Sequence, residues 1–315
     1  QNLNIVYSGS TNGWIPIDDD AVADVPEDPS ANPTGIFGYG DDGAYVSMSN
    51  LVSSAGVIAT DVSGVGTDRG NVAACEYGED KGIFGFGTDD TPLAMTNLVS
   101  NTGVIGTDVS GVGTGRYNPA AATFGGDKGI FGFGNTGSRT GITNLVSNTG
   151  VVATDTAAVG TARQSAAACE YSAIKDKAIF GFGYTGSNID ETNLVSNSGV
   201  VATDTTGVGT DRHHLAACDF GGDKGIFAYG YTSSSVSLSN LVSNVGVVAT
   251  DVTGVGTARH ALAATQYGND KGIFGYGNVP GVTGVSNLVS NAGVIATDVS
   301  GVGTARKEIA ACSWG

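Results

Sequence analysis

The chain contains few charged residues. Asp, Glu, Lys and Arg make up 14% of its 315 residues, against about 25% in an average domain. Acidic residues outnumber basic ones by 30 to 14, which leaves a net charge of −16. Because so acidic a chain repels phosphate backbones, we expect no nucleic-acid partner.

Other features are missing altogether. No run of 18 apolar residues is present, so the sequence predicts no membrane insertion. The 51 glycines follow no Gly-X-Y period, which excludes a collagen helix. No C-x-x-C, H-E-x-x-H, EF-hand or RTX spacing occurs, and acidic clusters such as Asp18 to Asp20 are typical of a solvated surface. We therefore expect no metal and no cofactor.

Repetition is what the sequence does contain. An Arg follows G-V-G-T-x, or A-V-G-T-x before Arg163, at spacings of 47, 47, 49, 47 and 47 residues. These repeated arginines are Arg69, Arg116, Arg163, Arg212, Arg259 and Arg306. Six units cover residues 34–315, and the two extra residues fall at Ala173 and Ile174. Residues 1–33 form a non-repeated extension that we interpret as an anchor or an extra strand.

Each unit contains four short runs rich in β-formers. In the last unit they are Leu262 to Gly268, Ile273 to Gly277, Val285 to Asn291 and Val294 to Val299. Four strands in a unit of this length are typical of one propeller blade. The sequence thus predicts an all-β fold, a six-bladed β-propeller of four-stranded antiparallel blades. An open β-solenoid is the alternative.

The two ends of the repeat region complement each other. The first unit begins with the second strand, at Ile36, and the chain stops after a first strand, Glu308 to Trp314. We expect this C-terminal strand to pair into the first blade and close the ring, which would remove the open sheet edges.

The repeated charges favour a structural role. Each unit carries one aspartate in its fourth run: Asp61, Asp108, Asp155, Asp204, Asp251 and Asp298. We expect each repeated Arg to pair with such an Asp or with carbonyls, because a guanidinium makes several hydrogen bonds at once. Six anion-binding sites are the alternative, but six near-identical copies fit a scaffold better than one active site.

The four cysteines occupy one repeated position, six residues after the repeated Arg, where the other two units have Ala122 and Thr265. Equivalent positions on different blades lie too far apart for a disulfide, which needs Cα atoms within about 7 Å. We therefore expect small buried side chains without disulfides.

Two segments differ between units. One connects the second and third strands, and the other follows the repeated Arg. In a four-stranded meander both emerge at one end of the blade, and loops on a rigid scaffold commonly carry recognition. The sequence therefore predicts a variable face that binds a partner, with the candidate residues Tyr45, Arg139, Tyr184, Tyr231, His213, His214 and His260.

The order T-A-R, an Ala-rich strand and then D-K-G-I-F-G-Y-G resembles the kelch-type β-propeller family over about 280 residues. Two departures are a Gly-aromatic-Gly end in place of a double glycine, and the missing kelch Trp. The phrases N-L-V-S-N-T-G-V-V-A-T-D-T and D-K-G-I-F-G-F-G also resemble Gly-rich repeats of bacteriophage virion proteins, such as tail or fibre components. That resemblance implies a virion component.

We therefore expect a non-enzymatic structural or attachment protein, located in a virion or outside the cell; Gln1 is compatible with processing. The expected partners are other protein subunits and a host-surface glycan, with an oligomer contact through residues 1–33. One alternative is a secreted lectin-like propeller. Another is a propeller glycosidase, which needs two carboxylates across one pocket, with Asp190 and Glu191 as candidates.

Overall fold

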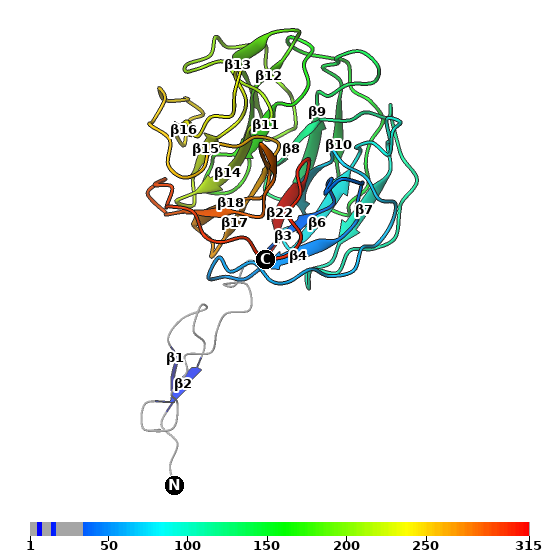
Figure 1. Ribbon diagram of the computed structural model, residues 1–315. Coiled ribbons are helices and arrows are strands. Elements are labelled where there is room, and N and C mark those ends of the chain that lie inside the picture. Colours follow the sequence, from blue (N-terminus) through cyan, green and yellow to red (C-terminus); the bar gives the residue numbers. More distant parts are fainter. Residues whose placement is uncertain (1–4, 8–13, 17–33, 315) are drawn as a thin grey trace.

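The computed structural model describes residues 5–7, 14–16 and 34–314, and in these residues it contains strands and connections but no helix (Figure 1). The all-β prediction is therefore confirmed. Correspondingly, this described part offers no helix long and apolar enough to cross a membrane. β1 (Ile5–Tyr7) pairs antiparallel with β2 (Trp14–Pro16). The rest of residues 1–33, including the predicted oligomer contact, lies outside the described residues.

From residue 34 onward the chain forms six three-stranded antiparallel sheets, an arrangement consistent with a six-bladed β-propeller. We number the sheets along the chain and call their strands inner, middle and outer. Sheets 1 to 3 are β22 (Ala310–Trp314), β3 (Thr34–Gly38), β4 (Ser49–Val52); β5 (Ala73–Tyr77), β6 (Lys81–Gly85), β7 (Thr96–Val99); and β8 (Ala120–Phe124), β9 (Lys128–Gly132), β10 (Thr143–Val146).

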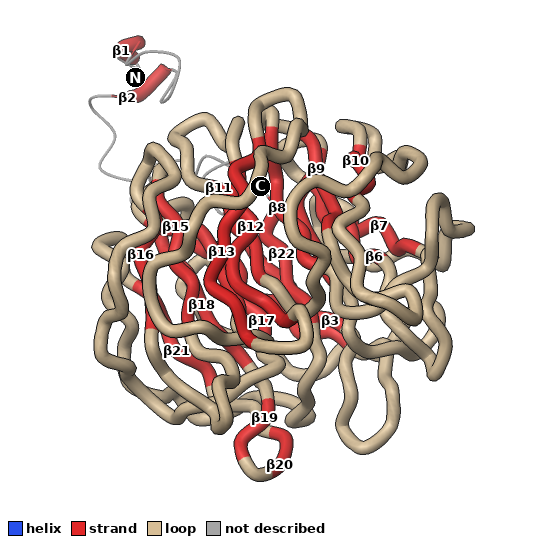
Figure 2. Tube along the Cα trace, turned by 90° about the horizontal axis from the view of Figure 1, so that it is seen from above, coloured by secondary structure: helices blue, strands red, loops and turns tan. Residues whose placement is uncertain are grey.

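Sheets 4 to 6 follow the same order. They are β11 (Ala167–Glu170), β12 (Ala178–Tyr184), β13 (Asn188–Val195); β14 (Ala216–Phe220), β15 (Lys224–Ala228), β16 (Ser239–Val242); and β17 (Ala263–Tyr267), β18 (Lys271–Gly275), β21 (Ser286–Val289). A small hairpin of β19 (Asn278–Val279) and β20 (Gly281–Val282) lies in the middle–outer connection of sheet 6 and projects from the body (Figure 2).

The inner strands gather at the centre of the molecule. Each contacts the inner strands of both neighbouring sheets, and all six line an axial cavity of about 110 Å³ at one end and about 60 Å³ at the other. Two successive alanines, such as Ala73 and Ala74, begin all six of these strands. Their small side chains allow six backbones to approach one axis.

Sheet 1 combines the two ends of the repeat region. β22 pairs antiparallel with β3 from Ala310↔Gly38 to Trp314↔Thr34. In Figure 1 the red β22 accordingly lies beside the blue β3.

A cycle of backbone hydrogen bonds joins the six sheets around the axial cavity. In each sheet, the residue two positions before the start of the inner strand has a positive φ between 51° and 57°. Its N–H donates to the carbonyl of the equivalent residue of the preceding sheet, at 2.8–3.1 Å. The cycle returns to its first member and consists of Asn71, Asn118, Ser165, His214, Ala261 and Glu308.

The fourth run of each unit differs from the prediction of a regular strand. In sheet 1 it contacts the outer strand through two isolated bridges, Ser49↔Val62 and Val52↔Ile58. Between them the Asn50 side chain donates hydrogen bonds to the carbonyl of Ala59 at 3.0 Å and to Asp61 at 2.8 Å. This side chain takes the place of ladder hydrogen bonds, so the structure has three strands and one bridged segment in each sheet.

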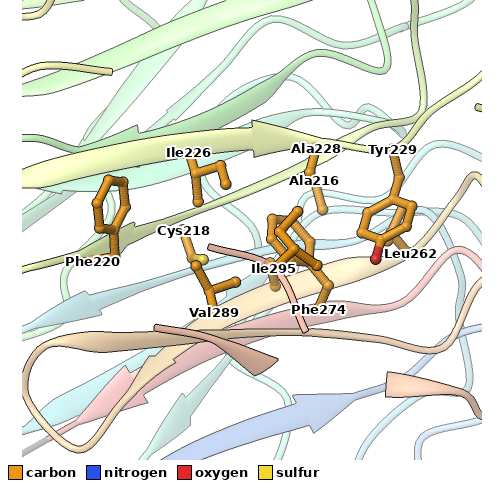
Figure 3. Close-up of a cluster of buried hydrophobic side chains, with 11 residues drawn as sticks. Ala216, Cys218, Phe220, Ile226, Ala228, Tyr229, Leu262, Phe274, Val289 and Ile295 are labelled. Carbon is orange, nitrogen blue, oxygen red and sulfur yellow. The ribbon is translucent and has the colours of Figure 1, made fainter. Parts of the chain in front are cut away.

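The hydrophobic core lies between sheets. Figure 3 shows one of six buried clusters, in which Phe220 and Ile226 of sheet 5 accompany Phe274 and Val289 of sheet 6. Aromatic pairs such as Tyr229 and Phe274, with ring centroids 5.4 Å apart, add edge-to-face contacts. Each sheet therefore depends on its neighbours for burial, as in other repeat proteins.

The four cysteines are free and buried, as the sequence predicts. Burial raises the pKa of the Cys75 thiol, and the other three behave alike. Thiols in this state are poor nucleophiles and serve as packing groups.

Candidate functional site

The repeated arginines are fully buried between neighbouring sheets. The guanidinium of Arg212 lies 4.1 Å from the ring centroid of Phe182 in sheet 4. It also donates to the carbonyl of Tyr229 at 2.9 Å and to Asn240 Oδ1 at 2.6 Å, both in sheet 5. One cation thus joins two sheets through a cation–π contact and two hydrogen bonds. Each of the other five repeated arginines also stacks on an aromatic ring of the preceding sheet.

The repeated aspartates orient the connections rather than bond directly to the arginines. Asp251 accepts hydrogen bonds from the Thr210 backbone N–H at 3.0 Å, from its hydroxyl at 2.6 Å and from Asn240 at 2.9 Å. Arg212 Nη1 lies 3.8 Å away, beyond hydrogen-bond distance. Burial alone would raise the pKa of Asp251, but these hydrogen bonds and the charge of Arg212 outweigh it and lower the pKa.

The two variable segments lie side by side. Six isolated backbone bridges connect the residue after each repeated Arg to the start of a middle–outer connection: Gly70↔Thr88, Tyr117↔Asn135, Gln164↔Tyr184, His213↔Tyr231, His260↔Asn278 and Asp41↔Lys307. Their predicted proximity is confirmed, and we call this surface the variable face.

The turns at the other ends of the strands form the opposite surface, which we call the constant face. It consists of the inner–middle turns and the turns that follow the outer strands. The two kinds of turn bond to each other, as in Asn148 Nδ2 to Asp127 at 3.0 Å and Asn244 Nδ2 to Asp223 at 3.0 Å.

The two faces differ in charge within residues 34–314. Apart from the repeated Asp and Arg, the two variable segments and the positions just before each repeated Arg carry nine acidic residues against Arg139 and Lys307, a net charge of −7. The acidic residues are Asp41, Asp42, Asp68, Asp89, Asp90, Asp190, Glu191, Asp211 and Glu308. The constant-face turns carry six acidic and six basic residues, a net charge of zero. Their acids are Glu79, Asp80, Asp127, Asp176, Asp223 and Asp270, and their bases are Lys81, Lys128, Lys175, Lys177, Lys224 and Lys271.

One sector of the variable face carries five contacting rings, which we call the histidine–tyrosine cluster: Tyr184, His213, His214, Tyr231 and His260. His213 lies at the centre, with ring centroids 5.0 Å from Tyr184, 4.9 Å from His214 and 5.6 Å from Tyr231. Tyr231 in turn lies 4.9 Å from His260. Sheets 4, 5 and 6 supply the cluster.

Polar side chains fix the imidazoles. His213 Nδ1 lies 2.7 Å from Asn188 Oδ1, and His260 Nδ1 lies 2.9 Å from Ser235 Oγ. Asn188 also donates to the carbonyl of Thr232 at 2.8 Å, which joins the sheet 4 hairpin to the sheet 5 connection. Sequence reasoning missed Asn188 and Ser235, and their place in the variable connections was the only signal that marked them.

The three imidazoles of the cluster are uncharged at neutral pH. Burial, together with the neighbouring His213 and His260, lowers the pKa of His214 to about 3. Burial also lowers the pKa of His213 and of His260. The imidazoles therefore offer rings and fixed hydrogen-bonding groups without a cationic charge of their own.

Two other predicted binding residues differ in position. Arg139 extends the cluster, because its guanidinium lies 4.8 Å from the Tyr184 ring centroid. Tyr45 belongs to sheet 1, where it bridges to Asp41 and packs against Gly70. The structure thus gathers Arg139 with the histidine–tyrosine cluster and places Tyr45 in another sector.

The insertion at Ala173 and Ile174 creates a second unrepeated feature. It brings Lys175 to the constant-face end of the axial cavity, where Nζ donates to Glu76 at 3.0 Å and lies 3.7 Å from Glu170. Asp219 lines the same cavity. Burial raises the pKa of Glu76 to about 7, although Lys175 opposes the shift. The sequence marked the insertion but gave no sign that its lysine reaches the axis.

Carboxylates of the described residues gather at the axial cavity, where Glu76, Glu170 and Asp219 lie near Lys175, and not at the predicted pair Asp190 and Glu191. Across residues 34–314 and the two short N-terminal strands, no group of three His, Cys, Asp or Glu side chains is arranged to hold a metal ion. Asp190 and Glu191 are neighbours on β13, and successive strand residues point to opposite faces, so they do not frame one pocket. No protein-family model and no curated protein matches the chain.

Proposed function

We propose that the six sheets are the blades of a closed propeller, each with the bridged segment as its fourth, outermost strand. The pairing of β22 with β3 and the hydrogen-bond cycle from Asn71 to Glu308 support closure. In this arrangement the repeated Arg, Asn and Asp side chains hold the blades together and leave the variable face free for recognition.

The function that this geometry supports best is that of a non-enzymatic attachment protein. Its variable face binds a ligand, and the histidine–tyrosine cluster is the centre of the site. The observation that carries this proposal is the asymmetry of the cluster: the scaffold repeats six times, whereas contacting aromatic and imidazole rings gather in one sector. A virion or extracellular location rests on the repeat resemblance.

The ligand class follows from the chemistry of that sector. Aromatic rings beside amides and hydroxyls suit the apolar faces and hydroxyl groups of sugars. The net charge of −7 on the variable face disfavours sialylated, sulfated or phosphorylated glycans. A neutral or amino-sugar glycan of a host surface is therefore the proposed ligand. The same charge supports a basic protein surface as the second candidate.

The lectin-like alternative with one shallow site per blade fits less well. Such a protein needs the same binding set at equivalent loop positions. Here the position of Tyr231 is occupied in other sheets by Asp41, Thr88, Asn135, Tyr184 and Asn278, which is not one chemical set.

A glycan array with matched variants tests the proposal. Tyr231→Asn and His213→Gln introduce residues that equivalent positions already contain, Asn135 and Gln164, so the fold should tolerate them. We expect wild-type binding to neutral or amino sugars, at least tenfold weaker in both variants. Val109→Thr in the bridged segment of sheet 2, where sheets 3 and 4 carry Thr156 and Thr205, is the control and should bind normally. Preference for anionic glycans, or equal binding by all variants, would refute the proposal.

A further inference from the structure

The constant face has a composition that the proposed ligand site does not explain. Each turn after an outer strand exposes one valine, and all six are 63–64% exposed: Val57, Val104, Val151, Val200, Val247 and Val294. Exposed positions on the variable face differ between repeats, whereas the exposed position in the turn after the outer strand is Val in every repeat. A solvated turn has no need of an apolar side chain, so its uniform presence points to a contact surface.

The insertion adds a more prominent apolar group to one sector of this face. Ile174 is 72% exposed, the highest value among the large apolar side chains of the described residues. Its position is fixed, because Gly126 of sheet 3 donates a backbone hydrogen bond to the carbonyl of Lys175 at 3.0 Å. Ile174 is thus a supported apolar projection rather than a loop tip without contacts.

An apolar cavity lies in the adjoining sheet. It has a volume of about 410 Å³, and its apolar lining is Phe124, Leu145, Val146, Val151 and Ala153 of sheet 3. Lys128 and Ser147 of sheet 3 and Asn197 and Ser198 of sheet 4 complete it. Its space exceeds that of one aliphatic side chain. The constant face therefore carries an apolar projection in sheet 4 and an apolar cavity between sheets 3 and 4.

We propose that the constant face is a self-association surface, on which Ile174 of one copy inserts into the Phe124 cavity of a second copy and receives that copy's Ile174 in return. A two-fold interface requires this reciprocity, because both subunits use the same surface. The occupant is a second copy of this chain because one face carries both the projection and the cavity. Two chains of charge −16 repel each other, but this face repels least: its turns hold six acids and six bases, and Glu76, Glu170 and Asp219 at the cavity end bring it to −3, against −7 on the variable face.

This arrangement has a consequence for attachment. When two constant faces meet, the two variable faces point outward on opposite sides of the dimer. A dimer therefore presents two ligand sites, and binding to a surface with many ligands gains avidity without any new contact. The association itself does not depend on the proposed ligand.

Sedimentation velocity of the full chain over a concentration series tests the interface. Wild type is expected to form dimers that dissociate on dilution. Ile174→Asp and Val151→Lys should each weaken dimerisation at least tenfold without changing the circular dichroism spectrum. The double variant Ile174→Asp/Val151→Lys should recover part of the association, because each Asp then meets a Lys of the other copy.

Val282→Asp supplies the matched control, because Val282 is a partly exposed valine on the variable face. It should leave the dimer intact. A monomeric wild type at every concentration would overturn the proposal. So would a dimer that persists in both single variants, since association would then use another part of the chain, such as residues 1–33. Glycan binding by a monomeric protein would leave the proposed function standing and remove only the dimer.

Discussion

The contact between Cys75 and Gly129 allows a quantitative test of how the sheets pack. A Cβ atom added to Gly129 in β9 would lie 2.5 Å from Cys75 Sγ in β5, far inside the contact distance of about 3.5–4.0 Å. Between sheets 3 and 4 the same space is filled in the opposite way. Ala122 stands at the cysteine position, Ala178 stands at the glycine position, and both lie in one buried cluster.

A double-mutant cycle follows from this exchange. Gly129→Ala should destabilise the protein by about 1–3 kcal/mol, the usual cost of overpacking a core. Cys75→Ala removes one buried heavy atom and should cost about 1 kcal/mol. In the double variant the new methyl group fills the space left by the sulfur, so we expect a favourable coupling of about 1–3 kcal/mol.

Urea denaturation followed by both fluorescence and circular dichroism measures the four free energies of unfolding. Agreement between the two signals checks that one transition is observed. If Gly129→Ala costs nothing, or costs the same in the wild-type and Cys75→Ala backgrounds, the two side chains do not share one space and the packing argument fails.

Three further predictions concern stability. Burial lowers the pKa of His214 to about 3, below its unfolded value, so stability is lost as pH falls from about 6.5; His214→Asn, matching Asn71 and Asn118, should reduce this loss by at most about 3 kcal/mol at pH 4. The pKa of Glu76 is raised to about 7, so the free energy of unfolding declines as pH rises from about 4.5 to 7. Glu76→Gln should remove up to about 3 kcal/mol of this decline, as measured by urea titrations at several pH values. Ala261 has a φ of 53°, so Ala261→Gly should stabilise by about 1 kcal/mol and raise the melting temperature.

The repeat made much of the fold predictable. Fixed spacing located the strands, and the incomplete units at Ile36 and Trp314 predicted the pairing of β22 with β3 that the structure shows. The fourth run was predicted as a regular strand because its composition is that of a strand. The Asn50 and Asp61 side chains recur in every unit, but their spacing does not reveal that Asn50 bonds across to the fourth run, because that contact exists only in three dimensions.

The candidate site was predictable only in part. His213 and His260 are 47 residues apart in sequence and were proposed for the same surface, because both follow a repeated Arg. Their ring contacts with Tyr231 could not be predicted from the sequence, because they depend on how the strands and connections of neighbouring sheets are oriented. Lys175 shows the limit most clearly, because a two-residue insertion says nothing about where the next side chain points.

The central claim is that repeated residues hold the sheets together while unrepeated residues of the variable face bind the ligand. Measuring thermal stability and glycan binding in parallel for Arg212→Lys and Tyr231→Asn tests it most directly. Arg212→Lys removes the guanidinium contacts to Tyr229 and Asn240 and should cost about 3 kcal/mol, with binding retained at temperatures where it is folded. Tyr231→Asn should keep its stability and lose binding at least tenfold. The reverse pattern, or loss of both properties together in each variant, would contradict the claim.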